Sequence, residues 1–478
     1  MASISKNFFY NTALSLSQLV IPIFTFPYVA RILGPGELGK VNFADSFAGY
    51  FMLFAGLGIP IYGIREIARA EKGKINHIFS EIFSIHLLFT SLVSIIYFLI
   101  VVFVFKGDHV LYFLLWGLLM LFSSSFIGEW YFQGTGRFKF IAIRTILNRI
   151  FFLIVLFLII KTKSDSVLYF MMIVLSTFLN AIVNFYIISK NVKIKVNFSF
   201  MTISRHIKPI FYIFFSRAAI TLFLFLDTII LGFLSSDSQV GFFTTALKIT
   251  KIPIMIVSSL GVVLMPNLAD AHSKNNIKIF RELIKKSISF VLGVSIPIVF
   301  FFYSCSDYIV EIFAGKQYSQ ASVLIKILCP IIIIIGLSTI FSQQILIPMK
   351  KDKEIMISVL IAITACIIFD FVLITYFNAL GAAYTNVIVE SIVMLSCFFF
   401  ATKYLPRFFQ IKEVMIYLIT AIPALFFNNL VTILTDNVLM ILALNITCSA
   451  IYFSIVYGII LKNEIFTALQ NKIKHFFV

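Results

Sequence analysis

The sequence has few charged residues and few of the residue types that build reactive centres. Only 12% of its 478 residues are charged, against about a quarter in an ordinary globular domain. Its five cysteines are scattered without a metal or redox spacing, and its six histidines are isolated. No HExxH or GxSxG pattern occurs. We therefore expect no enzyme activity, no metal and no cofactor, and we interpret the cysteines as small hydrophobic residues.

A nucleotide-binding loop and a secretory leader are also missing. The segment 34–41, GPGELGKV, resembles a phosphate-binding loop, but Val41 stands where that loop needs a hydroxyl. We interpret the segment as a tight turn between two apolar runs. The first apolar run continues to about Leu33 without a small-residue cleavage site, so we expect no signal peptide.

Apolar residues dominate the chain. They make up 60% of it and include 57 phenylalanines, which is more than a soluble core can bury. A helix needs roughly 20 apolar residues to cross the hydrocarbon core, and continuous runs of that length predict an all-α integral membrane protein. About fourteen spans are expected, and twelve if short turns near residues 379 and 436 do not separate spans. The expected spans are 8–32, 41–63, 79–105, 109–132, 140–160, 167–189, 209–234, 240–265, 285–304, 322–348, 355–377, 380–402, 413–434 and 437–461.

The positive charges are distributed unevenly between the two sides. Most of the 38 lysines and arginines, Arg144 included, are assigned to alternate loops that begin with the N-terminal side. The opposite loops carry only Arg31, Lys40, Lys106, Lys161, Lys163 and Lys316. This bias places both termini in the cytoplasm and explains the net charge of +17 without nucleic acid. A basic amphipathic stretch around Arg281, Lys285 and Lys286 is expected on anionic lipid at that surface.

A weak internal repeat suggests two parallel six-helix lobes. Gly39 and Gly241 each open a span, and a Leu-Gly pair begins eighteen or nineteen residues later, at Leu57-Gly58 and at Leu260-Gly261. Repeats of the same orientation are related by an axis normal to the membrane. Chance similarity between apolar helices is the competing explanation.

Several short stretches carry a family resemblance. They are FPYVARILGP at 26–35, GIPIYGIREIA at 58–68, EWYFQG at 129–134, SRAA at 216–219 with LDTIILG at 226–232, and VGFFTTALKI at 240–249. Together they resemble the Wzx-type flippases of O-antigen and capsule synthesis, within the multidrug/oligosaccharidyl-lipid/polysaccharide exporter superfamily. The resemblance covers roughly the first 270 residues, and the remainder matches in hydropathy only.

The resemblance implies a function and a domain plan. Such a protein moves oligosaccharide repeat units linked to undecaprenyl pyrophosphate from the inner to the outer leaflet of the bacterial cytoplasmic membrane. It works by alternating access, coupled to H+ or Na+, and its partners are membrane lipids, a polysaccharide polymerase and a chain-length regulator. We expect six-helix lobes at 1–190 and 209–402, and an additional helix pair with a cytoplasmic tail at 403–478.

Charged residues inside spans are the candidate site, because a charge facing lipid costs several kcal/mol. Arg217, Lys248, Arg149 and Lys251 could contact pyrophosphate or acidic sugar, since arginine and lysine suit phosphate. Alternatively, they pair with carboxylates to hold helices together. The carboxylates Asp45, Asp227, Asp370 and Glu390 could bind the coupling ion, or serve in structural ion pairs. The gate or anchor candidates at span ends are Arg31, Arg65, Glu66 and Glu129.

Three other functions compete with the flippase interpretation. A drug or cation exporter of the same superfamily would need an acidic lumen, and the mid-span charges lean towards cations. A membrane-embedded glycosyltransferase or polymerase commonly has a long outer loop, and every outer loop expected here is short. A membrane scaffold would not explain so many charges within spans.

Overall fold

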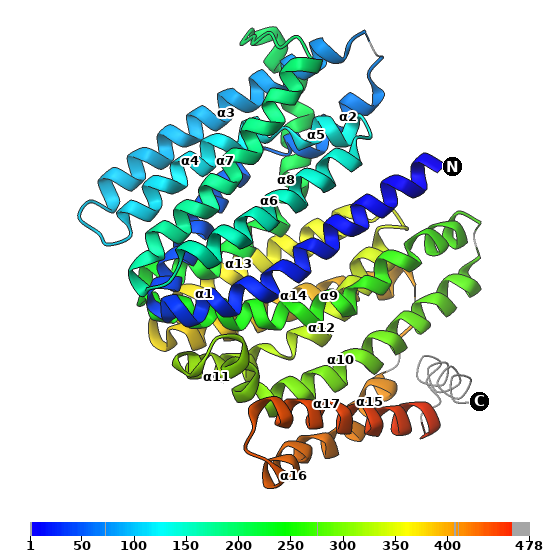
Figure 1. Ribbon diagram of the computed structural model, residues 1–478. Coiled ribbons are helices and arrows are strands. Elements are labelled where there is room, and N and C mark those ends of the chain that lie inside the picture. Colours follow the sequence, from blue (N-terminus) through cyan, green and yellow to red (C-terminus); the bar gives the residue numbers. More distant parts are fainter. Residues whose placement is uncertain (1, 72, 275, 406–407, 410, 461–478) are drawn as a thin grey trace. The chain divides into compact units, whose positions relative to one another are not determined.

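The computed structural model describes residues 2–71, 73–274, 276–405, 408–409 and 411–460, with only the backbone described in parts of some helices. The chain forms two compact units, Met1–Gly241 and Phe242–Val478. The first unit contains α1 (Ala2–Gly56), α2 (Ile59–Arg69), α3 (Ile75–Val104), α4 (Leu111–Ile127), α5 (Glu129–Gly134), α6 (Phe138–Ile159), α7 (Ser166–Asn191), α8 (Phe200–Leu234) and the start of α9 (Asp237–Ser273). The second contains the rest of α9, α10 (Ile277–Phe313), α11 (Ser319–Leu328), α12 (Ile331–Thr339), α13 (Asp352–Phe377), α14 (Ala379–Tyr404), α15 (Ile411–Ala421), α16 (Phe427–Leu434) and α17 (Val438–Ile455) (Figure 1).

The helices have the length and the surface of membrane spans. Among the described residues, eleven helices are long and apolar enough to cross a bilayer. The number is twelve if the pair Lys316–Leu328 and Ile331–Leu346, bent by 45°, forms one broken span. Large apolar side chains point outward, such as Phe103 at 77% and Ile433 at 80% exposure, which only a lipid environment accepts on this scale. The protein is therefore an all-α, multi-pass membrane protein.

The expected number of fourteen spans stays a prediction. Each of the fourteen expected runs overlaps described helix, but residues 21–69 pass as a single long helix although two spans were expected there. In α8, the apolar helix found among the described residues is the short stretch Phe225–Leu234.

Glycines break the helices of the first unit where the chain turns. Gly34 interrupts α1 with a φ of 77° and a ψ of 173°, and Pro35 then begins the next helical stretch. Gly58, with a φ of 75°, separates α1 from α2. The segment with the near-miss phosphate-loop pattern is thus a break between two helical stretches.

The two halves of the internal repeat differ locally. The chain is broken at Leu57 and Gly58, which both have positive φ, whereas α9 runs unbroken through Leu260 and Gly261. Gly39 and Gly241, which the repeat pairs by sequence, contact each other at the start of α9. They therefore form one helix crossing within the first unit.

Packing in the first unit centres on α1 and α4. The helix α4 packs against α1, α3 and α7, while α2 packs against α3, α5 and α8. Aromatic side chains fill the space near α2 and α5: Phe79 stacks on Trp130 with ring centroids 4.9 Å apart. Gly63 lets this indole approach, since a Cβ there would lie 2.5 Å from the ring. This cluster holds α2 and α5 in place, which carry the charged residues Arg65, Glu66 and Glu129.

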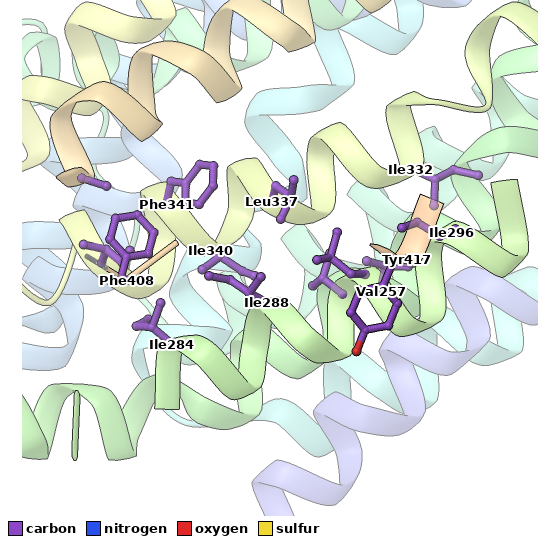
Figure 2. Close-up of a cluster of buried hydrophobic side chains, with 14 of the residues drawn as sticks. Val257, Ile284, Ile288, Ile296, Ile332, Leu337, Ile340, Phe341, Phe408 and Tyr417 are labelled. Carbon is purple, nitrogen blue, oxygen red and sulfur yellow. The ribbon is translucent and has the colours of Figure 1, made fainter. Parts of the chain in front are cut away.

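In the second unit, α10 is the central helix. It packs against α11, α12, α15 and α17, and α13 pairs with α14. Its buried face includes Ile284, Ile288 and Ile296, which lie in one core cluster with residues of the α12 region such as Leu337 and Phe341 (Figure 2). Each unit thus has its own core.

The predicted lobe boundaries at 1–190, 209–402 and 403–478 stay a prediction. The two compact units divide between Gly241 and Phe242, so α8 belongs to the first unit together with the first six expected spans.

Candidate functional site

The cationic candidates on α9 point out of the packed interior. Lys248 and Lys251 are both exposed, whereas Ala246, Ile249 and Thr250 around them are buried. The two lysines are three residues apart and share one helix face. The side chain of Arg217, on α8, lies outside the described residues. The exposed lysine pair is consistent with binding an anionic group.

Arg149 is partly buried on α6 and already has a partner. Its guanidinium donates a hydrogen bond of 2.8 Å to Ser17 Oγ, which joins α6 to α1. Because the Ser17 hydroxyl is uncharged, this hydrogen bond does not neutralise the positive charge of Arg149. The arginine can therefore hold a helix in place and still attract an anion.

The carboxylate candidates divide between the two units. Asp227 is 3% exposed on α8, and Asp45 is partly buried on α1. Asp370 is fully buried on α13, where Cys366 Sγ lies 3.4 Å from Asp370 Oδ2, and Glu390 is partly buried on α14. A carboxylate buried this deeply in a membrane helix is costly unless a cation or proton compensates it.

The gate or anchor candidates lie at helix ends or near a helix break. Arg31 is exposed on α1, three residues before the break at Gly34. On α2, Arg65 Nε lies 3.0 Å from Glu66 Oε1, and its guanidinium lies 5.1 Å from the Tyr62 ring centroid. Since both charged side chains are partly exposed, this pair contributes little stability.

Glu129 joins a polar cluster that ties α5, α6 and α7 together. Arg144 donates hydrogen bonds to Glu129 and to Asn184, and the Asn184 amide donates to the carbonyl of Ile127. The assignment of Arg144 to a loop is wrong: it lies in the second turn of α6, and its side chain is 8% exposed. The expected span 140–160 already contained Arg144, so the error lies in counting its charge with the preceding loop.

We expect Arg144→Met to lower the free energy of unfolding by about 2 kcal/mol, because Glu129 and the amide oxygen of Asn184 lose the hydrogen bonds that Arg144 donates. The loss stays below that of a fully buried pair, since the Glu129 side chain is 37% exposed. Thermal unfolding of purified protein, followed by gel filtration, measures the change. Arg137→Met is the control, because Arg137 is exposed and makes only weak contacts: a 3.5 Å hydrogen bond to Asn191 and a cation–π contact 6.0 Å from the Tyr131 ring centroid. Equal melting temperatures for both variants would contradict a stabilising role of Arg144.

A charge cluster around the buried carboxylate of Glu81 was not predicted from the sequence. This carboxylate, 6% exposed on α3, lies 3.2 Å from His206 Nε2 and 3.3 Å from Arg205 Nη1, both on α8. His77, one turn earlier, lies 3.2 Å from it, and Tyr62 Oη lies 2.5 Å from His206 Nδ1. The one signal was His77 and Glu81 at i and i+4; the partners on α8 are 124 and 125 residues away.

The linker before α8 is fastened to the same face of α3. The backbone N–H of Lys195 donates to Ser80 Oγ at 3.0 Å, and that of Asn197 donates to Ser84 Oγ at 2.9 Å. These serines flank Glu81 in the sequence. The cluster around Glu81 and this linker together fix the start of α8 on α3.

A second set of polar contacts lies at the opposite end of α3. His109 Nε2 lies 2.7 Å from Asp237 Oδ2, which joins the α3–α4 turn to the start of α9. Glu37 on α1 accepts a 2.5 Å hydrogen bond from Ser166 at the start of α7, and Lys40 lies 2.6 Å from it. Side-chain polar contacts therefore join helices of the first unit near both ends of α3.

The comparison that decides the family covers more than half of the chain. A family model described as "Polysaccharide biosynthesis protein" matches residues 4–272. The chain belongs to this family. A second model, MatE, matches residues 213–372.

Two curated relatives are similar to this chain over most of their length. A protein of Escherichia coli (strain K12) named "Putative O-antigen transporter" is 26% identical over 404 residues, which cover 82% of this chain and 95% of the relative. The "Capsular polysaccharide biosynthesis protein CapF" of Staphylococcus aureus is 23% identical over 83% of this chain and 98% of its own.

Solved structures show the same fold. An inward closed conformation of the lipid II flippase MurJ superimposes with a TM-score of 0.78 at 16% identity, covering 95% of this chain and all of that one. An inward-facing MATE family multidrug resistance transporter of the MOP superfamily gives 0.65 at 14% identity, covering 84% and 98%. The chain therefore has the same fold as these two transporters.

Proposed function

We propose that this protein is a flippase for oligosaccharide repeat units linked to undecaprenyl pyrophosphate. It would move them from the inner to the outer leaflet of the bacterial cytoplasmic membrane by alternating access. The observation that carries the proposal is membership of the polysaccharide biosynthesis family, together with similarity to an O-antigen transporter over 95% of that relative. The protein acts as a transporter, not as an enzyme, with both termini in the cytoplasm.

We propose that cations on the membrane helices hold the pyrophosphate. Lys248 and Lys251 support this role because they share one exposed face of α9, and Arg149 because it keeps its charge while bonding to Ser17. Arginine offers forked donors and lysine a mobile point charge, so the two suit a diphosphate. Arg217 is proposed for the same role from its position in α8.

We further propose that buried carboxylates couple transport to H+ or Na+. Asp227 and Asp370 are the stronger candidates because both are almost fully buried, and Asp45 and Glu390 are partly buried. Protonation or cation binding would remove the cost of a buried charge and so favour one conformation over the other. We also propose Arg31, Arg65, Glu66 and Glu129 as gate or anchor residues, and a polymerase and a chain-length regulator as partners.

Deletion of the gene, followed by complementation, tests the function. We expect the deletion strain to lose its surface polysaccharide, wild type to restore it, and Lys248→Ala or Arg217→Ala to restore less than about a tenth, if each loses a charge-assisted contact worth about 1.5–3 kcal/mol. Lys316→Ala is the control, since Lys316 is 86% exposed and lies 3.6 Å from Glu311. Comparable expression of all variants must be shown by immunoblot. Full restoration by Lys248→Ala and Arg217→Ala would contradict the cationic site.

A multidrug exporter is the second candidate, favoured by the MatE match over residues 213–372. The same strains distinguish the two. If surface polysaccharide is unchanged while the deletion strain becomes sensitive to cationic drugs, the exporter function replaces the flippase function.

A further inference from the structure

A pocket of about 430 Å³ lies in the second unit where four helices begin or end. Its polar lining consists of His272 near the end of α9, Arg281 in the second turn of α10, Lys351 just before α13, and Tyr404 at the end of α14. Its apolar lining consists of Ile277, Phe280, Met349 and Leu405. We call this site the basic pocket. Its volume lies within the range of about 300–1,000 Å³ that is usual for small-molecule sites.

Among the described residues, neither Arg281 nor Lys351 forms a salt bridge with a carboxylate, although Glu354 is near enough to Lys351 to interact with it electrostatically. The Nε atom of Arg281 is buried and has no hydrogen-bond partner among the described residues. Lys351 Nζ lies 4.2 Å from the centre of the Tyr404 ring, a cation–π contact that leaves its full charge in place. A buried guanidinium nitrogen without a partner is costly, so an anion that accepts from it would be stabilised.

The surroundings of the pocket increase its positive potential. The adjoining segments carry more lysines than carboxylates. The lysines are Lys274, Lys278, Lys285, Lys286, Lys350, Lys353 and Lys403, and the carboxylates are Asp270, Glu282, Asp352 and Glu354. Glu354 is held by Tyr404, whose hydroxyl donates to it at 2.6 Å, and Asp270 lies 2.8 Å from Lys274. Helix dipoles do not decide the sign, because two helices begin and two end here. The side-chain charges therefore favour an anion.

The pocket lies at the depth of lipid head groups. The helix α10 has 37 residues, about 55 Å at 1.5 Å per residue, which exceeds the hydrocarbon thickness of about 30 Å. Its uncharged stretch is 287–306, and Arg281 precedes that stretch. Residues 355–369 of α13 are likewise uncharged, and Lys351 precedes them. The pocket thus combines a polar side at the interface with an apolar side towards the acyl chains.

We propose that the basic pocket binds the phosphate head group of an anionic membrane lipid on the inner side of the bilayer. Arg281 and Lys351 contact the phosphate, and Ile277, Phe280 and Met349 cover the glycerol and the first part of an acyl chain. Basic pockets between membrane helices on the cytoplasmic side commonly bind such head groups. The proposal does not depend on the transported cargo. A bound lipid would clamp the ends of α9, α10, α13 and α14 together.

Lipid binding to the purified, delipidated full-length protein tests the proposal. Native mass spectrometry counts bound phosphatidylglycerol during a titration, with phosphatidylcholine as the uncharged comparison. We expect one tight phosphatidylglycerol site in wild type and at least about tenfold weaker binding in Arg281→Gln/Lys351→Gln, since charge-assisted hydrogen bonds contribute about 1.5–3 kcal/mol each. The matched control is Lys278→Gln/Lys285→Gln, which removes the same charge from exposed positions of α10 outside the pocket.

Two further arms, a variant that fills the pocket and a soluble competitor, decide between explanations together with the two controls. Met349→Trp, which fills the pocket without changing charge, should also weaken phosphatidylglycerol binding while the protein elutes as a single species. Equal loss in the control double variant would overturn the proposal, because it would indicate diffuse charge attraction. Equal binding of phosphatidylcholine would overturn it as well. Displacement of the lipid by an equal concentration of glycerol phosphate would show that the ligand is a soluble phosphate compound and not a lipid.

Discussion

Gly39→Ala and Gly241→Ala should each strongly destabilise the first unit. A Cβ on Gly39 would lie 1.8 Å from the carbonyl oxygen of Asp237, and one on Gly241 would lie 1.9 Å from the carbonyl oxygen of Pro35. Both obstacles are backbone atoms, which cannot rotate away as a side chain can. Overpacking typically costs about 1–3 kcal/mol, and a backbone clash this short should reach about 3 kcal/mol or more. The helical stretch that begins at Pro35 and the start of α9 must therefore move apart, or the first unit must unfold.

Thermal unfolding in detergent, followed by gel filtration, measures this effect. Gly36→Ala is the matched control on the same segment, since its Cβ would meet only Ser238 Oγ at an ordinary 3.4 Å. We expect a much lower melting temperature for the first two variants and little change for the control. The double variant should lose less than the sum of the two single losses, because both changes separate the same crossing. Three indistinguishable melting temperatures would contradict this close crossing.

Glu81→Leu should cost about 3–5 kcal/mol of unfolding free energy. Removing the buried carboxylate leaves its buried partner His206 desolvated without it, whereas Arg205 and His77 are mostly exposed. His206, 5% exposed, and Tyr62, 4% exposed, would stay buried without the carboxylate that His206 contacts. Since the cluster joins α3 to the start of α8, we also expect the variant to transport poorly.

A matched control and a double-mutant cycle make this test specific. Glu71→Leu removes an exposed carboxylate that lies 2.9 Å from Lys74, and it should cost less than about 1 kcal/mol. In a background that already carries His206→Phe, Glu81→Leu should cost distinctly less than in wild type, because part of the interaction is already lost. Equal costs for Glu81→Leu and Glu71→Leu, or strict additivity with His206→Phe, would show that the cluster does not stabilise the fold.

The fold class could be predicted from the sequence because lipid imposes it. Runs of about 20 apolar residues permit only helices, and described helix overlaps each expected run. The 45° bend between α11 and α12 was not foreseen, since it lies at Pro330 inside one continuous apolar run. Hydropathy measures the length of a run and is blind to a bend within it.

The candidate site was harder to predict, because hydropathy gives the depth of a charge and not the direction that it faces. Lys248 was correctly placed within a membrane helix, and the structure adds that it is exposed there. Arg144 was counted with the preceding loop although the expected span 140–160 contained it, and it lies in the second turn of α6. Glu81 was missed because its partners on α8 are over a hundred residues away, and only tertiary packing brings them together. Long-range charge pairs of this kind leave no local pattern.

The leaflet position of the lipid-linked repeat unit tests the proposed flippase function most directly. Spheroplasts of the deletion strain, with and without the wild-type gene, would be treated with an impermeant reagent that labels the sugar. The fraction of lipid-linked oligosaccharide that is labelled from outside is the quantity to measure. We expect a substantial labelled fraction with the wild-type gene, and almost none without it while repeat units accumulate on the inner side. An equal labelled fraction in both strains would contradict the proposed flippase function.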